Sequence, residues 1–236
     1  MTADDQGECG LRQGYDRLLL DACVGVVVAL VLAVLLKTFV VGAAYVPSGS
    51  MERTLFPGDF VLVNKLGRSA DVLLPNLLLG FRPRVFRTPY MRRTRIGEIV
   101  LFRPPASMLP GHTGNDVLFL KRCIAAGGDT VEFREGRATV NRRPLILPGT
   151  AEAWNGKQEG GATAVEGTTV VSEDCVFLLG DNPSASLDSR IWGCVREDQI
   201  VGSAVVIYWS MWPPGSSGGR YRLFRAIRWD RIGTIL

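Results

Sequence analysis

The longest apolar stretch of the chain lies near its N-terminus. Residues 18–36 read LLLDACVGVVVALVLAVLL, and residues 22–36 carry no charge. Together with the apolar residues that follow Lys37, the stretch exceeds the ~20 residues that a helix needs to cross the hydrocarbon core of a bilayer. We therefore predict a single transmembrane anchor over residues 18–44, preceded by a short N-terminal segment, residues 1–17.

A cleaved signal peptide is the alternative interpretation of this stretch. Its apolar core would be shorter, ~7–15 residues, and the segment before it would be more basic. Here four acidic side chains precede the stretch, beside Arg12 and Arg17. The pattern favours a retained anchor. Basic residues flank the anchor on both sides, so the residues alone leave its orientation open.

Beyond the anchor, apolar and polar positions alternate with the period of β-strands. A hairpin is predicted over residues 129–145, with its turn near Gly136. Segments 74–95 and 150–167 have the composition of loops, and the apolar segment 72–81 is either core or a surface that contacts lipid. The remaining candidate strands are 58–66, 97–103, 117–124, 170–179 and 200–209. We therefore predict a mainly β fold.

Composition excludes several classes of protein. The chain has 236 residues, of which 47% are hydrophobic and 21% are charged, so most of it is expected to fold. Its net charge of +4 is too small to indicate binding to nucleic acid. None of the five cysteines has CxxC spacing and His112 is the only histidine, so we predict no metal ion and no other cofactor. The sequence leaves open whether Cys123, Cys175 and Cys194 form a disulfide.

Three short blocks after the anchor contain residues that can carry chemistry. The first reads VPSGSMERTL, residues 46–55, and includes Ser50. The second reads LKRCIAAGGD, residues 120–129, and places Lys121 in an otherwise apolar strand. The third reads GDNPSASLDSR, residues 180–190. A serine hydroxyl is a weak nucleophile until a base takes its proton, and a lysine becomes such a base when burial favours its neutral form.

The three blocks together resemble those of the type I signal peptidases, membrane-bound Ser-Lys peptidases that remove signal peptides from exported proteins. PSGSM resembles the serine box of that family, KRCIAAGGD its lysine box, and GDNPSASLDSR its third box. Residues 228–233 resemble its closing segment, so the likeness covers most of the chain from about residue 25 onward. The sequence departs at Arg53, where the family usually has proline, and at Pro183, where many members have arginine.

The resemblance implies a role for each residue of the site. Ser50 would be the nucleophile and Lys121 the general base. Ser48 would contribute its hydroxyl, with the backbone N–H of Ser50, to the oxyanion hole. Ser186 would hydrogen-bond Lys121 and orient it, and Gly180 would leave room for the lysine to approach.

Further residues are expected to support the site and to bind substrate. By the resemblance, Asp181 pairs with Arg122 and Asp188 pairs with Arg190. The family cleaves after small residues at positions −1 and −3 of the signal peptide, and the substrate is expected to bind as an extended strand. The positions that match the pocket residues of the family are Val46, Met51, Leu55, Val61, Phe119 and Leu120.

The resemblance also implies an architecture and a location. We expect an antiparallel β-sheet catalytic domain of signal-peptidase type over residues 45–135 and 172–236, with a smaller inserted β region over residues 136–171. The anchor would cross the bacterial cytoplasmic (inner) membrane once, with the catalytic domain on the extracytoplasmic side. The expected partners are the signal peptides of preproteins, the lipid bilayer and the export translocon.

Three alternatives remain at this stage. A GDNP variant also occurs in conjugation-type peptidases that mature pilin-like substrates. An inactive membrane-anchored scaffold is disfavoured because both Ser50 and Lys121 are present. A self-cleaving Ser-Lys repressor would need a DNA-binding helix-turn-helix at the N-terminus, where this chain has its apolar stretch.

Overall fold

The computed structural model of the chain describes residues 3–68, 71–74, 84–87, 90–105, 117–146, 166–212 and 227–236. His112, most of the apolar segment 72–81 and nearly all of the predicted loop 150–167 lie outside these residues.

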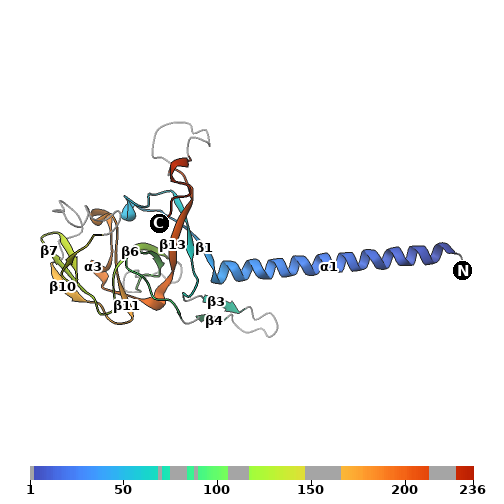
Figure 1. The fold of residues 1–236 in the computed structure, drawn as a ribbon, viewed down its shortest axis with the longest axis horizontal. Coiled ribbons are helices and arrows are strands. Elements are labelled where there is room, and N and C mark those ends of the chain that lie inside the picture. The colour runs from blue at the N-terminus through green and yellow to red at the C-terminus, as the bar shows by residue number, and fades with distance from the viewer. Residues whose placement is uncertain are drawn as a thin grey trace.

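The N-terminal helix stands apart from the rest of the protein. Helix α1 (Ala3–Phe39) projects from the β domain as one long rod (Figure 1). The most apolar 18-residue window of its segment Arg17–Phe39 has a mean hydropathy of 2.9, and none of that window is buried against the protein. Within the described residues, this is the one helix long and apolar enough to cross a membrane. The predicted anchor is therefore present as an exposed apolar helix.

The helix is shorter than the predicted anchor at its C-terminal end. We predict the anchor through residue 44, but α1 ends at Phe39 and strand β1 (Val41–Tyr45) follows it. Strand β1 pairs antiparallel with β2 (Asp59–Asn64) along its whole length. An apolar run gives no local signal for this change, because the pairing partner that stabilises the strand lies about twenty residues further along the chain.

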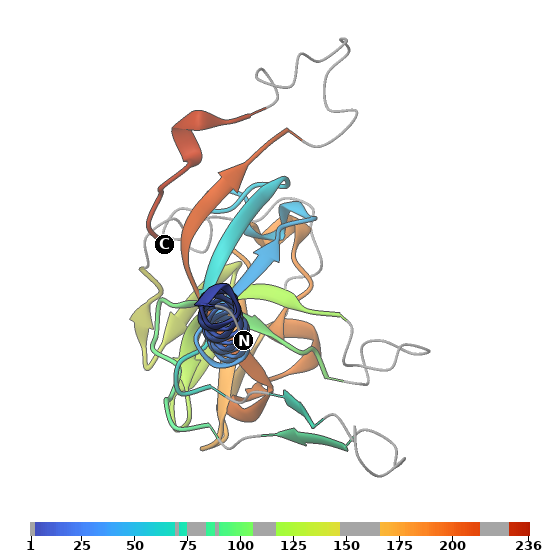
Figure 2. The same cartoon turned by 90° about the vertical axis from the view of Figure 1, so that its right-hand side faces the viewer.

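Seven strands form the main antiparallel sheet, in the order β1-β2-β13-β5-β6-β11-β12. The mainly β fold is confirmed, and each of the five candidate strands outside the hairpin overlaps an observed one. Register shifts in the pairing of β13 with β2 and β5 bend the sheet, as the view along α1 shows (Figure 2). The strands not yet delimited are β5 (Ile99–Phe102), β6 (Phe119–Ala126), β11 (Cys175–Leu179), β12 (Val195–Arg196) and β13 (Ile200–Ser210).

A second sheet has four strands in the order β10-β7-β8-β9. The predicted hairpin is confirmed, because β7 (Thr130–Arg134) pairs with β8 (Arg137–Val140) around a turn at Glu135 and Gly136. Both turn residues have positive φ, 50° and 74°, as a tight two-residue hairpin requires. Because β7 begins at residue 130, this sheet starts earlier than the inserted region predicted over 136–171. The other strands are β9 (Arg143–Pro144) and β10 (Gly167–Val170).

Short elements complete the fold. Strand β4 (Arg84–Arg87) lies within the segment 74–95, which is expected to be a loop, and pairs with β3 (Asp71–Leu74), which ends where that segment begins. Helix α3 (Ser189–Trp192) and four 3-10 turns connect the strands. These turns are η1 (Gly49–Met51), η3 (Pro183–Ala185), η4 (Glu197–Gln199) and η6 (Trp229–Arg231). Among the side chains that the structure describes, the cysteines Cys23, Cys123, Cys175 and Cys194 are free thiols.

A buried carboxylate ties the C-terminal segment to the start of β2. Asp59 is fully buried and accepts hydrogen bonds from Arg231 Nη2 at 2.7 Å, Arg228 Nη2 at 3.0 Å and Ser210 Oγ at 2.7 Å. Arg231 also donates to the backbone oxygen of Thr54, at 2.8 Å. The C-terminal segment therefore holds the chain that follows Ser50 in place.

We predict that Asp59→Asn destabilises the protein by about 3–5 kcal/mol, because it leaves the buried guanidinium of Arg228 and the partly buried one of Arg231 without their carboxylate. Thermal unfolding in detergent measures the effect. Asp198→Asn is the matched control, since Asp198 pairs with Arg196 on the surface, where such a pair contributes about 0–1 kcal/mol. Equal losses in the two variants would contradict the role assigned to Asp59.

Candidate active site

Ser50 lies in the 3-10 turn η1, shortly after strand β1. Its neighbours Val46, Met51 and Leu55 are buried in the core beneath β1 and β2. Val46 N donates to Asp59 O, and Leu55 N donates to Met51 O. Because apolar side chains on both sides of Ser50 are anchored in the core, the turn holds the serine hydroxyl in one position.

Lys121 lies in β6, where it is opposite Val100 of β5. Its Nζ is 2.6 Å from Ser50 Oγ, within hydrogen-bond distance. The lysine is 4% exposed and the serine 8%, so the contact is almost shielded from water. The structure therefore brings together the two residues to which the sequence assigns the chemistry.

Burial lowers the pKa of Lys121 to about 8, because removal from water disfavours the charged ammonium. The carboxylates of Asp188 and Asp181 act in the opposite direction, and the Arg190 guanidinium adds to the lowering. A pKa near 8 means that a useful fraction of this amine is neutral close to neutral pH.

The third block packs directly against the turn that carries Ser50. Asn182 donates from its backbone N to Ser50 O at 3.1 Å. Its side-chain Nδ2 donates to Gly49 O at 3.1 Å and to Glu52 Oε2 at 3.2 Å. No role is predicted for Asn182 or Glu52 from the sequence, although Asn182 lies inside the third block. These bonds fix the distance between the two blocks.

Gly180 makes this close packing possible. A Cβ at this position would lie 2.2 Å from Ser186 Oγ and 2.5 Å from Ser50 O. Ser186 is buried, and its Oγ has no hydrogen-bond partner among the described residues. The predicted hydrogen bond from Ser186 to Lys121 is thus absent from the structure, where the Lys121 amine contacts Ser50 instead.

Both ion pairs expected from the sequence are present beside the site. Arg122 Nε and Nη2 contact the two carboxylate oxygens of Asp181 at 2.8 and 2.6 Å. Arg190 Nε and Nη2 contact those of Asp188 at 2.8 and 3.0 Å. Arg122 Nη2 also donates to Thr54 Oγ1, so the first pair braces the chain after Ser50. Both carboxylates are fully buried and paired in the two-point geometry that arginine favours.

A cleft of about 600 Å³ opens beside Ser50 and Lys121. Four of the six residues predicted for the substrate pocket line it: Val46, Met51, Phe119 and Leu120. The other two, Leu55 and Val61, are wholly buried in the core and do not line the cleft. The exposed Ser48 also lines it. The lining residues that are not predicted from the sequence come mainly from β1 and from the residues just before β6, and include Ala44, Tyr45, Leu101, Leu118, Ala185 and Leu187.

Arg53 has a backbone conformation that proline cannot adopt. Its φ is 98°, whereas the ring of proline holds φ near −65°. The sequence departs from the family pattern at this position, where proline is usual. The turn after Ser50 therefore has a different local backbone from one that contains proline.

Comparisons with known proteins identify the family. The model of the family described as signal peptidase, peptidase S26, matches residues 19–209. The chain belongs to this signal peptidase family. Signal peptidase I of Leptolyngbya laminosa is 30% identical over 198 residues, which cover 82% of this chain and 81% of the relative. Signal peptidase I of Haemophilus influenzae is 28% identical over 82% of this chain and 72% of its own length.

One solved structure of a signal peptidase I, from Enterococcus faecalis V583, is also similar. It shares 27% sequence identity with this chain and has a TM-score of 0.37, over 48% of this chain and 97% of its own. Membership of the signal peptidase family supports the removal of signal peptides by a serine peptidase. The exposed apolar helix fits a membrane-anchored member of this family. Within the part of the chain that the structure describes, no three His, Cys, Asp or Glu side chains form a group that could bind a metal ion.

Proposed function

We propose that the protein is a membrane-anchored endopeptidase that removes signal peptides from exported preproteins, with Ser50 as nucleophile and Lys121 as general base. The observation that carries the proposal is the buried contact of 2.6 Å between Lys121 Nζ and Ser50 Oγ. A serine with a base in direct contact, shielded from water, is the arrangement that nucleophilic catalysis requires.

The two residues are sufficient for a complete catalytic cycle. Ser50 Oγ attacks the carbonyl carbon of the scissile peptide while the neutral Lys121 amine takes the hydroxyl proton. Lys121 then returns this proton to the departing amine nitrogen as the C–N bond breaks, which leaves an ester on Ser50. A water molecule that gives its proton to Lys121 hydrolyses the ester. Lys121 returns that proton to Ser50 Oγ as the ester C–O bond breaks, and the signal peptide leaves as a carboxylic acid that gives its proton to the solvent.

Two further hydroxyl groups are assigned supporting roles. Ser48 lines the cleft beside Ser50 and would donate, with the Ser50 backbone N–H, to the oxyanion of the transition state. Ser186 has a buried hydroxyl without a partner among the described residues. Since a protonated lysine has three N–H donors, we assign to Ser186 the role of accepting from Lys121 once the ammonium forms. This assignment would account for an otherwise costly unpaired polar group.

The walls of the cleft support a preference for small residues. Met51, Phe119 and Leu120 line it with apolar side chains next to the two reactive groups. Such walls would exclude large side chains from positions −1 and −3 of the substrate. The free edge of β1 borders the same cleft and would pair with an extended substrate strand.

The proposed location follows from the anchor and the proposed substrate. Helix α1 would cross the bacterial inner membrane once, with the β domain on the extracytoplasmic side, where signal peptides emerge. Substrate and enzyme would then share one bilayer, which raises their effective concentration. The export translocon would be the source of the substrate.

We predict that Ser50→Ala and Lys121→Met each reduce cleavage of a preprotein with an Ala-x-Ala site by at least ~10³-fold. Methionine keeps the length of the lysine without its amine, so the fold is expected to persist, and melting temperatures in detergent test this. The cut site is read by mass spectrometry. Cleavage by Lys121→Met at the wild-type rate would refute the assignment of the base. A wild-type protein that cuts only pilin-like substrates would favour the conjugation-type alternative.

The lowered pKa of Lys121 predicts the pH dependence of the reaction. Only the neutral amine can accept a proton, so kcat/KM should fall about tenfold for each pH unit below 8 and level off above it. Steady-state cleavage between pH 5.5 and 9.5 measures the profile, and melting temperatures over that range separate titration from unfolding. A profile that is flat down to pH 6 would contradict the proposal.

The position of Met51 predicts a change in specificity. Met51→Ala should widen the cleft and raise the ratio of kcat/KM for leucine over alanine at position −1. Leu55→Ala is the matched control, because Leu55 is buried in the same core without lining the cleft. It should cost about 2–5 kcal/mol of stability but leave the ratio unchanged. An equal change of the ratio in both variants would show that the cleft residues do not set specificity.

A further inference from the structure

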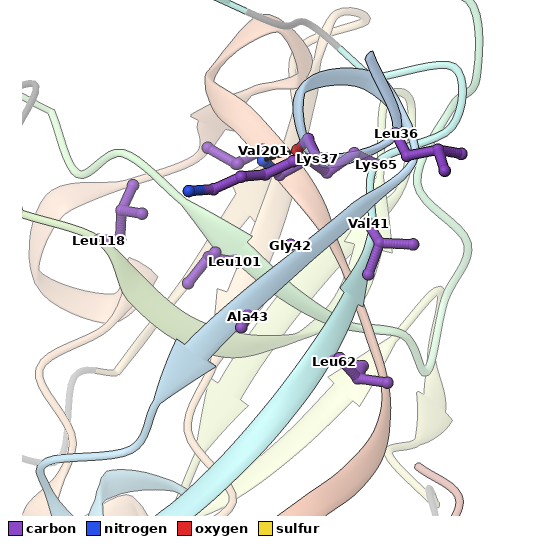
Figure 3. A pocket seen from close by; sticks show the side chains of 10 residues that line it. All are labelled: Leu36, Lys37, Val41, Gly42, Ala43, Leu62, Lys65, Leu101, Leu118 and Val201. Atoms are coloured by element: carbon purple, nitrogen blue, oxygen red, sulfur yellow. Dashed lines mark hydrogen bonds between the residues drawn. The ribbon is translucent and has the colours of Figure 1, made fainter. Parts of the chain in front are cut away.

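A second pocket lies where the membrane helix meets the main sheet. It has a volume of about 630 Å³ and is lined by the end of α1, by β1 and by parts of β2, β5 and β13. Apart from Lys37 and Lys65, every residue that lines it is apolar or glycine. Figure 3 shows both lysine side chains at one end of this pocket, with Ala43, Leu101 and Leu118 beyond them.

The position of Lys65 is built into the fold. Its backbone N donates to Val40 O at 2.9 Å, and its Nζ donates to Lys37 O at 3.1 Å. The side chain passes directly over Gly42, where a Cβ would lie 2.7 Å from Lys65 Cε. The absence of a side chain at residue 42 therefore gives the lysine its path across β1 to the end of the helix.

The charges around Lys65 are of one sign. Burial lowers the pKa of Lys65, and the positive charges of Lys37 and Arg103 lower it further. No carboxylate is among the groups that shift it. Like charges held together at the mouth of an apolar pocket repel each other until an anion binds between them.

The position of the pocket at the end of the apolar helix indicates which class of anion would fit it. Lys37 lies in the last turn of α1, at the end of the span Arg17–Phe39, so in a bilayer both lysines lie at the level of the lipid headgroups. The apolar side chains of Leu36 and Val41 line the same pocket. A molecule with a phosphate joined to acyl chains matches both the charge and the apolar wall.

We propose that this pocket binds one anionic phospholipid, with its phosphate between Lys37 and Lys65 and the upper part of an acyl chain against Leu36 and Val41. The site would fix the height of the β domain above the bilayer. It is a binding site distinct from the cleft that contains Ser50, and its occupancy does not depend on the proposed peptidase activity.

The test is a lipid titration of the full chain in detergent, followed by native mass spectrometry. Phosphatidylglycerol and phosphatidylcholine with identical acyl chains are the two probes. Wild-type protein should retain phosphatidylglycerol preferentially. Lys65→Gln should weaken its retention roughly fivefold, and the variant with both lysines replaced by glutamine should weaken it further. Arg17→Gln is the matched control, because it removes a charge at the opposite end of the span and should have no effect.

A variant that preserves every charge gives an independent test. Gly42→Ala should displace the Lys65 side chain and weaken retention of phosphatidylglycerol as Lys65→Gln does, and melting temperatures show whether the variant folds. Equal retention of both lipids by wild type, or an equal loss in Arg17→Gln, would overturn the proposal. So would unchanged lipid retention in the lysine variants. Weaker preprotein binding with lipid retention intact would assign the pocket to substrate instead.

Discussion

The contact between Lys121 and Ser50 exists only because the fold keeps a lysine out of water. An exposed lysine would be an ammonium ion at neutral pH and would have no capacity to accept a proton. The central strand β6 places the amine beneath the turn that carries Ser50, and the buried neighbours of Ser50 prevent that turn from moving away. The main sheet thus keeps the lysine buried, and the C-terminal segment holds the chain that follows Ser50 in place.

The two carboxylates near Lys121 are each paired with an arginine, which limits their effect on the pKa of the lysine. Asp181 and Asp188 are fully buried, and an unpaired carboxylate at either position would favour the ammonium form of Lys121. Each is instead held by an arginine in two-point contact, Arg122 for the first and Arg190 for the second. The pairs stiffen the third block while much of the negative charge is compensated locally. The pKa of Lys121 therefore reflects mainly its burial.

Elements that depend on a local residue pattern can be predicted from the sequence. Element boundaries that depend on pairing with a distant strand cannot. The alternation of apolar and polar residues predicts the main strands, and Gly136 predicts the turn of the hairpin. The end of the anchor at Phe39 could not be predicted, because only pairing with β2 distinguishes the strand from the helix. Similarly, apolar character cannot separate Met51, which lines the cleft, from Leu55, which lies in the core behind it. The tertiary structure alone determines whether an apolar side chain of this loop faces the cleft or the core.

Strand β1 links the two pockets and connects the end of α1 to the turn that carries Ser50. It begins two residues after α1 ends, and its five residues lead to the turn with Ser50. At ~3.3 Å per residue, β1 spans roughly 17 Å, and the turn that carries Ser50 follows it. Ala43, Leu101 and Leu118 border both pockets, so the pocket at the helix end and the cleft beside Ser50 are direct neighbours.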